Sequence, residues 1–294
     1  MIRDALGDKD YWDTWIQFED QTIEKMVKQL EQNPGQPNYR PQFIYEIANE
    51  YRENLFQRYS RGDDIAELRE LLVPIIDYWE KSELMGKEVW SKTQQVSRHS
   101  WEVNFDHYIV CFWLVGLAIL LELPDAEWFR LINLVGNEGK DALLDLVIAK
   151  RSPTRKIGDQ LCFDKPYRHL YEAVNCADKS KQTHKLYEFV KNWYSELRTI
   201  GHSSKKKPLP RHSHPYWYRF GDENFEGGAY FGRWCIEAAA VAKAFNIDDS
   251  LCLGHEHYPG DLLRPNGPTT HKVRQEDNSA HKKSHWLSRF FNSK

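Results

Sequence analysis

The longest uninterrupted apolar stretch runs from Tyr108 to Leu121, fourteen residues, and is closed by Glu122 and Pro124. A helix that crosses a bilayer needs about 20 apolar residues, so this stretch is too short to span a membrane. The mean hydropathy of −0.70 also excludes a multi-span membrane protein. We therefore predict a helix over 105–121, buried at the centre of a helical bundle.

Apolar residues recur at spacings of three and four through most of the chain, whereas period-two alternation and hairpin turns are sparse. This pattern predicts an all-α fold, a multi-helix bundle with helix-pair units in two closely packed helical domains. The expected domains cover 1–100 and 101–263, and 264–294 is expected to be a basic, flexible tail. Further helices are expected over 11–31, 43–59, 65–79, 125–134, 141–149, 167–174, 185–197 and 229–245.

Local signals set several helix ends. Gly62 is expected to stop the helix over 43–59, and Asp64 with Glu67 three residues later is typical of a capping box. Asp125 is expected to be the N-cap of the helix that follows it. Residues 201–227 contain Lys205-Lys206-Lys207, prolines and histidines, so we predict a long exposed loop there.

The net charge of −3 conceals a division of the chain. Residues 1–150 carry 27 acidic and 16 basic side chains, a net of −11, whereas 151–294 carry 16 acidic and 24 basic, a net of +8. The lysine run 205–207 and the tail suggest nucleic-acid binding at first, but the acidic half argues against a continuous basic face. The division instead favours an acidic face for a basic partner, with no direct contact to nucleic acid.

No basic segment followed by an apolar run opens the sequence, and the five cysteines contain no CxxC pair. Reduced, buried thiols are typical of a cytoplasmic protein, which is the compartment we expect.

Signatures of catalysis are sparse. The sequence lacks a Walker loop, GxGxxG, GxSxG and HExxH. His255 with His257 and His212 with His214 form H-x-H pairs, but no third ligand follows at a fixed spacing. We interpret these histidines as solvated loop residues and expect no metal, no cofactor and no catalytic residue. The alternative is an α-helical metal-dependent hydrolase that uses His255, His257, Asp248 and Asp261.

Acidic residues gather around the alanine-rich segment 238–244. Asp222 and Glu226 precede it, Glu237 lies within the expected helix, and Asp248-Asp249 follow it. Helix capping and ion pairing would explain these residues without any function. Paired carboxylates also perform acid–base catalysis, but the spacing does not separate that role from structural salt bridges.

A weak internal repeat relates two helix-turn units. A shift of 124 residues aligns Leu117 with Val241, Ala118 with Ala242 and Asp125 with Asp249. Either a duplicated helix pair or a chance likeness of two such units explains the alignment.

Three motifs in the second half carry a resemblance to a known family. They are Gly232-x-Trp234-x-x-Glu237-Ala-Ala-Ala, Ile247-Asp-Asp-Ser250, and Tyr258-Pro259-x-Asp261-Leu262. In this order they resemble the C-terminal signature of the PoNe immunity protein family (PoNi). Weaker marks of the same family run through the earlier chain, so the resemblance covers roughly residues 3–263.

The resemblance implies a non-enzymatic, all-α immunity protein. Members of the family neutralise a DNase toxin of the PD-(D/E)xK type, often delivered by a type VI secretion system, so the implied partner is that toxin. No membrane partner is implied, and both a monomer and a homodimer remain open. A helical scaffold for another partner is the remaining alternative. The signature residues Gly232, Trp234, Tyr258 and Pro259 are expected to be architectural. The candidate contacts to the toxin are Asp125, Asp222, Glu226, Glu237, Asp248, Asp249 and Asp261.

Overall fold

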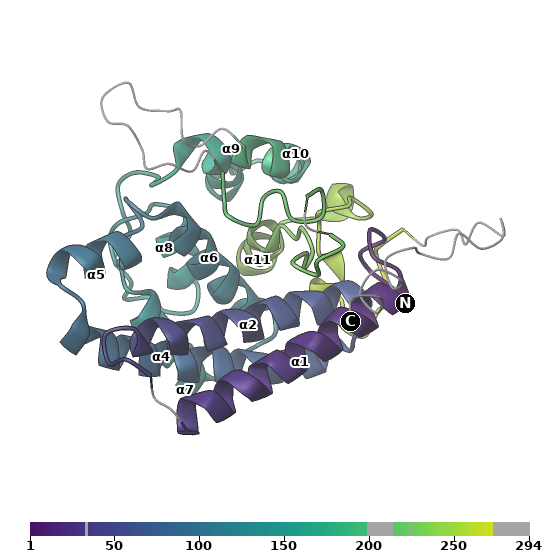
Figure 1. The fold of residues 1–294 in the computed structure, drawn as a ribbon. Coiled ribbons are helices and arrows are strands. Elements are labelled where there is room, and N and C mark those ends of the chain that lie inside the picture. Colours follow the sequence, from purple (N-terminus) through teal and green to yellow (C-terminus); the bar gives the residue numbers. More distant parts are fainter. Residues whose placement is uncertain (33–34, 199–213, 224, 273–294) are drawn as a thin grey trace.

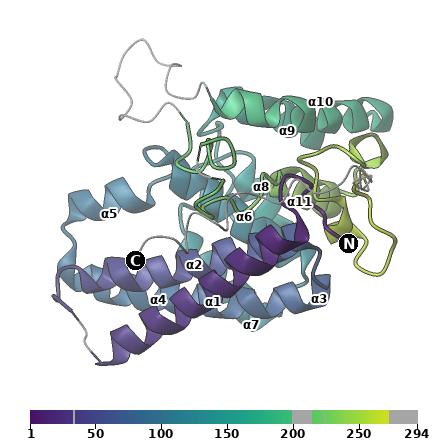
Figure 2. The ribbon, with the colours of Figure 1, turned by 45° about the vertical axis from the view of Figure 1, so that its right-hand side comes forward.

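The central apolar stretch forms helix α6 (Phe105–Leu120), whose side chains are nearly all buried. The computed structural model describes residues 1–32, 35–198, 214–223 and 225–272, and every regular element within these ranges is helical. Three layers stack on one another, with α6 in the middle one (Figures 1 and 2). The all-α prediction is therefore confirmed.

The first layer is built around α2, which packs against α1 on one side and α4 on the other. Its helices are α1 (Lys9–Gln32), α2 (Arg40–Arg61), α3 (Ile65–Leu68), the 3₁₀ turn η1 (Arg69–Leu71), α4 (Leu72–Val89) and α7 (Asp125–Val135). Gly62 ends α2 with φ +102°, as expected, and a Cβ there would lie 1.7 Å from the carbonyl oxygen of Met1. The expected helix over 65–79 is divided by η1. Asp64 caps α3 by accepting from the amide of Ala66 at 2.8 Å.

The other two layers hold α6, α8 and α11 in the middle, and α9 with α10 outermost (Figures 1 and 2). The helices of these layers are α8 (Leu144–Ala149), α9 (Asp164–Asn175), α10 (Lys179–Leu197) and α11 (Ile236–Phe245). Two 3₁₀ turns follow α11, namely η3 (Ser250–Cys252) and η4 (Gly260–Leu263). Helix α5 (Lys92–His99) lies at one end of the molecule (Figures 1 and 2). The expected helix over 229–245 begins only at Ile236. The preceding residues are not helical, and the amide of Cys235 bonds to the carbonyl of His257 (2.8 Å).

Helices α6 and α11 end in the same way. Each is followed by a residue with positive φ, Glu122 at 54° and Asn246 at 51°. The next amide then bonds back to the helix, over 2.9 Å at Leu123 and 3.0 Å at Ile247. Both ends are therefore the same helix-terminating motif, displaced by 124 residues.

The two helices also pack side by side and run parallel. A Cβ on Gly116 of α6 would lie 3.0 Å from the Cβ of Ala240, so only glycine permits this approach. One turn further along both helices, the Nζ of Lys243 donates to the carbonyl of Leu120 at 3.1 Å. Residues about 124 apart thus face one another across the α6–α11 contact.

Two segments expected to be exposed or flexible are packed. Trp217 is 2% exposed and stacks on Trp193 at 5.9 Å, so the later part of the expected loop over 201–227 belongs to the core; residues 199–213 lie outside the described residues. His271 is also buried, and its Nε2 lies 3.0 Å from the hydroxyl of Tyr59. The first part of the expected tail, up to residue 272, therefore packs on the folded chain, and 273–294 lie outside the described residues.

One continuous apolar core joins α2 and α4 to α6 and α8–α11. It crosses the expected boundary at residue 100 without interruption. No helix in the described residues is long and apolar enough to cross a membrane.

Candidate partner-binding surface

The Gly-x-Trp motif fixes the alanine-rich helix to the end of α2. The indole nitrogen of Trp234 donates to Ser60 Oγ at 2.8 Å, and the ring packs edge-on against Tyr59 at 5.0 Å. Gly232 has φ +107°, and a Cβ there would lie 2.4 Å from the indole nitrogen of Trp234. Glycine is required here both by its backbone conformation and by the lack of space. These two signature residues are therefore packed within the fold, between α11 and the end of α2.

The second half of the signature encloses Asp249. Its carboxylate accepts from the hydroxyl of Tyr258 at 2.8 Å and from Nη1 of Arg264 at 2.9 Å, and the residue is 5% exposed. Pro259 is buried and precedes η4. Asp249 precedes η3 but makes no side-chain cap there, because its oxygens face Tyr258 and Arg264.

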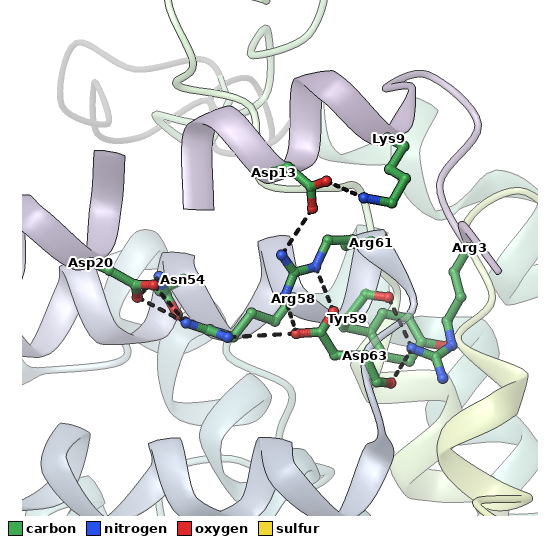
Figure 3. A network of polar contacts seen from close by, with 9 residues as sticks. All are labelled: Arg3, Lys9, Asp13, Asp20, Asn54, Arg58, Tyr59, Arg61 and Asp63. Atoms are coloured by element: carbon green, nitrogen blue, oxygen red, sulfur yellow. Dashed lines mark hydrogen bonds and ion pairs between the residues drawn. The ribbon is translucent and has the colours of Figure 1, made fainter. Parts of the chain in front are cut away.

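Asp261 joins the two ends of the described chain. It accepts from Arg3 Nε at 2.8 Å, from the Thr270 amide at 2.6 Å and from the Thr269 hydroxyl at 2.9 Å. Burial alone would raise the pKa of this carboxyl, but the hydrogen bonds outweigh it and hold the pKa below its usual value. Arg3 in turn donates to the carbonyls of Tyr59 and Asp63 (Figure 3).

Glu237 lies in the core at the start of α11. It is 0% exposed, and its Oε1 accepts from the hydroxyl of Tyr167 at 3.1 Å. Burial raises the pKa of Glu237 to about 7, although hydrogen bonding from its backbone, from Tyr167 and from nearby indoles acts against the rise. Glu237, Asp249 and Asp261 are thus enclosed by their own chain and unavailable to a partner in this structure.

The other four candidates are exposed. Asp125 pairs with Arg151 at 2.6 Å and Asp222 with Arg233 at 2.9 Å, while Asp248 accepts from the Ser250 amide. Glu226 is exposed in the segment that follows Asp222, and it has no ion pair within the described residues. Asp125 is the first residue of α7 and makes no side-chain cap, so the N-cap prediction is wrong; Pro124 is the N-cap. These carboxylates lie on three separate segments of the chain.

The histidines expected to be solvated are partly enclosed. His257 Nδ1 lies 3.0 Å from the carbonyl oxygen of Arg233, and the ring packs on Trp193. Burial lowers the pKa of His257 to about 4. No group of three or more His, Cys, Asp or Glu in the described ranges could hold a metal ion, and His212 lies outside those ranges. The residues of the hydrolase alternative do not converge, because Asp261 is held by Arg3 while Asp248 faces solvent.

The most unusual carboxylates were missed by sequence reasoning and lie where α1 meets α2. Glu19 is 9% exposed, its Oε1 has no hydrogen-bond partner within the described residues, and its carboxyl is within hydrogen-bonding reach of Glu50. Burial, and then Glu50, Glu53 and Asp20, raise the pKa of Glu19 to about 10. A signal was present in the sequence, since Glu19 stands in the apolar stripe of α1 between Trp15 and Ile23.

Nearby carboxylates at the α1–α2 contact are neutralised. Arg58 binds Asp20 at 2.7 Å, and Arg61 binds Asp63 at 2.6 Å and Asp13 at 3.0 Å (Figure 3). No arginine or lysine in the described residues pairs with Glu19 or Glu50. Within the described residues, the Glu19–Glu50 pair at the α1–α2 contact therefore has no basic partner, unlike Asp13, Asp20 and Asp63 beside it.

Comparisons with known proteins agree with this architecture. The fold resembles the crystal structure of protein PA2201 from Pseudomonas aeruginosa, with a TM-score of 0.65, 17% identity and 88% of each chain covered. A comparison with curated proteins finds no match. The family model for the N-terminal part of PoNe immunity proteins matches residues 3–133, and the model for their C-terminal part matches 139–262. This chain therefore belongs to the PoNe immunity protein (PoNi) family.

Proposed function

We propose that this protein protects its own cell by binding a cognate DNase toxin and keeping DNA out of the toxin's active-site cleft. The observation that carries the proposal is the match of both family models, which together span most of the described chain. The net charge of −11 over residues 1–150 supports it. A nuclease cleft must attract phosphate and is therefore basic, so an acidic protein is steered toward it and competes with DNA there.

The proposal also specifies the compartment in which the toxin is bound and the route by which the toxin enters the cell. A toxin that cleaves the chromosome must be met in the cytoplasm, and a type VI secretion system of a competing cell is the proposed route of delivery. No catalytic step is assigned to this chain, because a protein that occludes a cleft acts through binding alone.

The test uses the purified full-length chain and the nuclease encoded beside its gene. A stable complex on size-exclusion chromatography and loss of DNA cleavage at equimolar ratio are expected. Cleavage that is unchanged by an excess of this chain would contradict the proposed function.

A second measurement separates occlusion from indirect inhibition. A catalytically inactive form of the nuclease is titrated with labelled DNA, with and without this chain. Occlusion predicts that the two ligands compete, so the apparent Kd for DNA rises in proportion to added protein. A ternary complex with unchanged DNA affinity would contradict occlusion while leaving inhibition itself intact.

A further inference from the structure

We propose that the Glu19–Glu50 pair on the α1–α2 face is the position at which a lysine or arginine side chain of the toxin docks. This inference rests on the proposed function, because it names the contact through which the basic partner is held. The pair is reached through Glu50, which is half-buried, whereas Glu19 lies beneath it.

The surroundings of the pair carry excess negative charge. Glu46, Glu50 and Glu53 follow one another at spacings of four and three along α2, so they share one face of the helix. Glu53 accepts from the hydroxyl of Tyr216 at 2.8 Å and lies 3.4 Å from Nη2 of Arg52. Arg52 is therefore turned toward Glu53, and it does not pair with Glu19 or Glu50.

A buried polar atom without a hydrogen-bond partner is costly and calls for an explanation. The Oε1 atom of Glu19 is such an atom: it is fully buried and has no hydrogen-bond partner in the described residues. An arriving cation would supply the missing hydrogen bond and would pair with the negative charge that Glu19 and Glu50 share. The unsatisfied atom thus points to a cationic ligand.

The chemistry of that ligand follows from what borders the pair. The carboxylates here do not converge in an arrangement that could hold a metal ion, within the part of the chain that is described. Phe18, the residue before Glu19 on α1, is 55% exposed and packs edge-on against Trp15 at 5.6 Å. An exposed ring on the same helix as Glu19 offers a surface on which a guanidinium or the apolar stem of a lysine packs.

The test compares Glu50→Lys and Glu19→Gln with a matched control, Glu24→Lys, for binding to the nuclease encoded beside the gene. Glu24 lies on α1 and is exposed, and within the described residues it pairs with Lys28 at 3.8 Å. We expect Glu50→Lys to weaken the Kd by about 100-fold and Glu19→Gln by about tenfold. Glu24→Lys has the same charge change and should alter the Kd by less than about threefold.

The outcomes separate the inference from the proposed function. Wild-type protein that binds the nuclease, together with a Glu50→Lys variant that binds within threefold of it, would overturn the docking position and leave the immunity function standing. Wild-type protein that does not bind would remove both. Circular dichroism and thermal unfolding establish that each variant is folded.

A measurement on the unaltered protein covers the case in which a variant does not fold. Exposed carboxyls are coupled to glycine ethyl ester with a carbodiimide, with and without bound nuclease, and are located by mass spectrometry. Glu50 should be protected at least about fivefold in the complex, as expected for a desolvated contact, whereas Glu24 should react equally in both states. Equal labelling of Glu50 in both states would overturn the proposal.

Discussion

The carboxylates of the C-terminal signature and those of the α1–α2 face have the same chemistry in opposite surroundings. Asp249 and Asp261 are buried but receive hydrogen bonds from basic, hydroxyl and amide groups of their own chain. Glu19 is almost as buried, yet its charged neighbours are acidic and one of its oxygens has no partner in the described residues. Buried carboxylates therefore have opposite effects on the stability of this fold: Asp249 and Asp261 stabilise it, whereas Glu19 destabilises it.

This difference indicates where to look for binding. Residues that define a family motif can be committed to architecture, as Asp261 is by its contact with a residue 258 positions away. A carboxylate that weakens the fold and is left uncompensated is the better candidate for a contact with another molecule. The following changes are expected to separate these roles, beginning with the largest effect.

Asp261→Asn should lower the free energy of unfolding by about 3–5 kcal/mol, because it leaves the buried guanidinium of Arg3 without its carboxylate. Urea denaturation followed by circular dichroism measures this free energy of unfolding.

The stabilisation by Asp261 also depends on pH. The folded-state pKa of Asp261 lies below its usual value, so its contribution to stability is present above the unfolded pKa and is lost as the pH falls through the folded pKa. The exposed control Asp248→Asn should change stability by less than about 0.5 kcal/mol; equal losses would contradict this assignment.

Gly232→Ala should cost about 2–4 kcal/mol, since a methyl group would lie 2.5 Å from Ser60 Oγ at a φ of +107°. Gly139→Ala is the matched control. It has φ +78° but no atom closer than 3.7 Å, so only backbone strain of about 1 kcal/mol is expected. Similar thermal unfolding midpoints for the two variants would show that the contact between Gly232 and the end of α2 is unimportant.

Glu19→Gln should raise stability at pH 8 by about 1–3 kcal/mol, because it removes a buried ionisable group next to Glu50. The folded-state pKa of Glu19 is raised to about 10. Its favourable contribution is therefore complete below the unfolded pKa, near 4.5, and is lost as the pH rises through the folded value. Denaturation between pH 5 and 9 should show a flatter profile for the variant, whereas Glu24→Gln should follow the wild type; a destabilised Glu19→Gln protein would refute the comparison.

Asp125→Asn should have the smallest effect on folding, less than about 0.5 kcal/mol, because its ion pair with Arg151 lies at the surface. Chemical denaturation checks this value. The same variant tests the proposed contact of Asp125 with the toxin, since any loss of affinity would then reflect binding alone. A large loss of stability would place Asp125 with the architectural carboxylates.

Local patterns were sufficient for much of the fold. The apolar stretch predicted the central helix α6, and Gly62 predicted the end of α2, because both depend on neighbouring residues. The start of α11 at Ile236 does not follow from local patterns, because the amide of Cys235 bonds to the carbonyl of the distant His257 instead of joining a longer helix. The lysines, prolines and histidines that precede Trp217 predict an exposed loop, whereas stacking on the distant Trp193 decides its burial.

The candidate site was harder to predict than the fold. Exposure and pairing depend on partners far apart in sequence, such as Arg3 for Asp261 and Glu50 for Glu19. A list of acidic residues therefore mixes enclosed and accessible groups. The local sequence signal for this site is Glu19, an acidic residue in the apolar stripe of α1. The signal points to a binding site only once Glu50 on the facing helix α2 is known.

The contacts of Arg3 with Asp261 and of Tyr59 with His271 have a consequence for synthesis. Chains emerge from the ribosome beginning at the N-terminus. The end of α2 therefore lacks these two contacts until residues 261–271 have also left the ribosome. A chain that ends before these residues lacks both contacts. The packing around the end of α2 is therefore completed only after residue 271 has been translated.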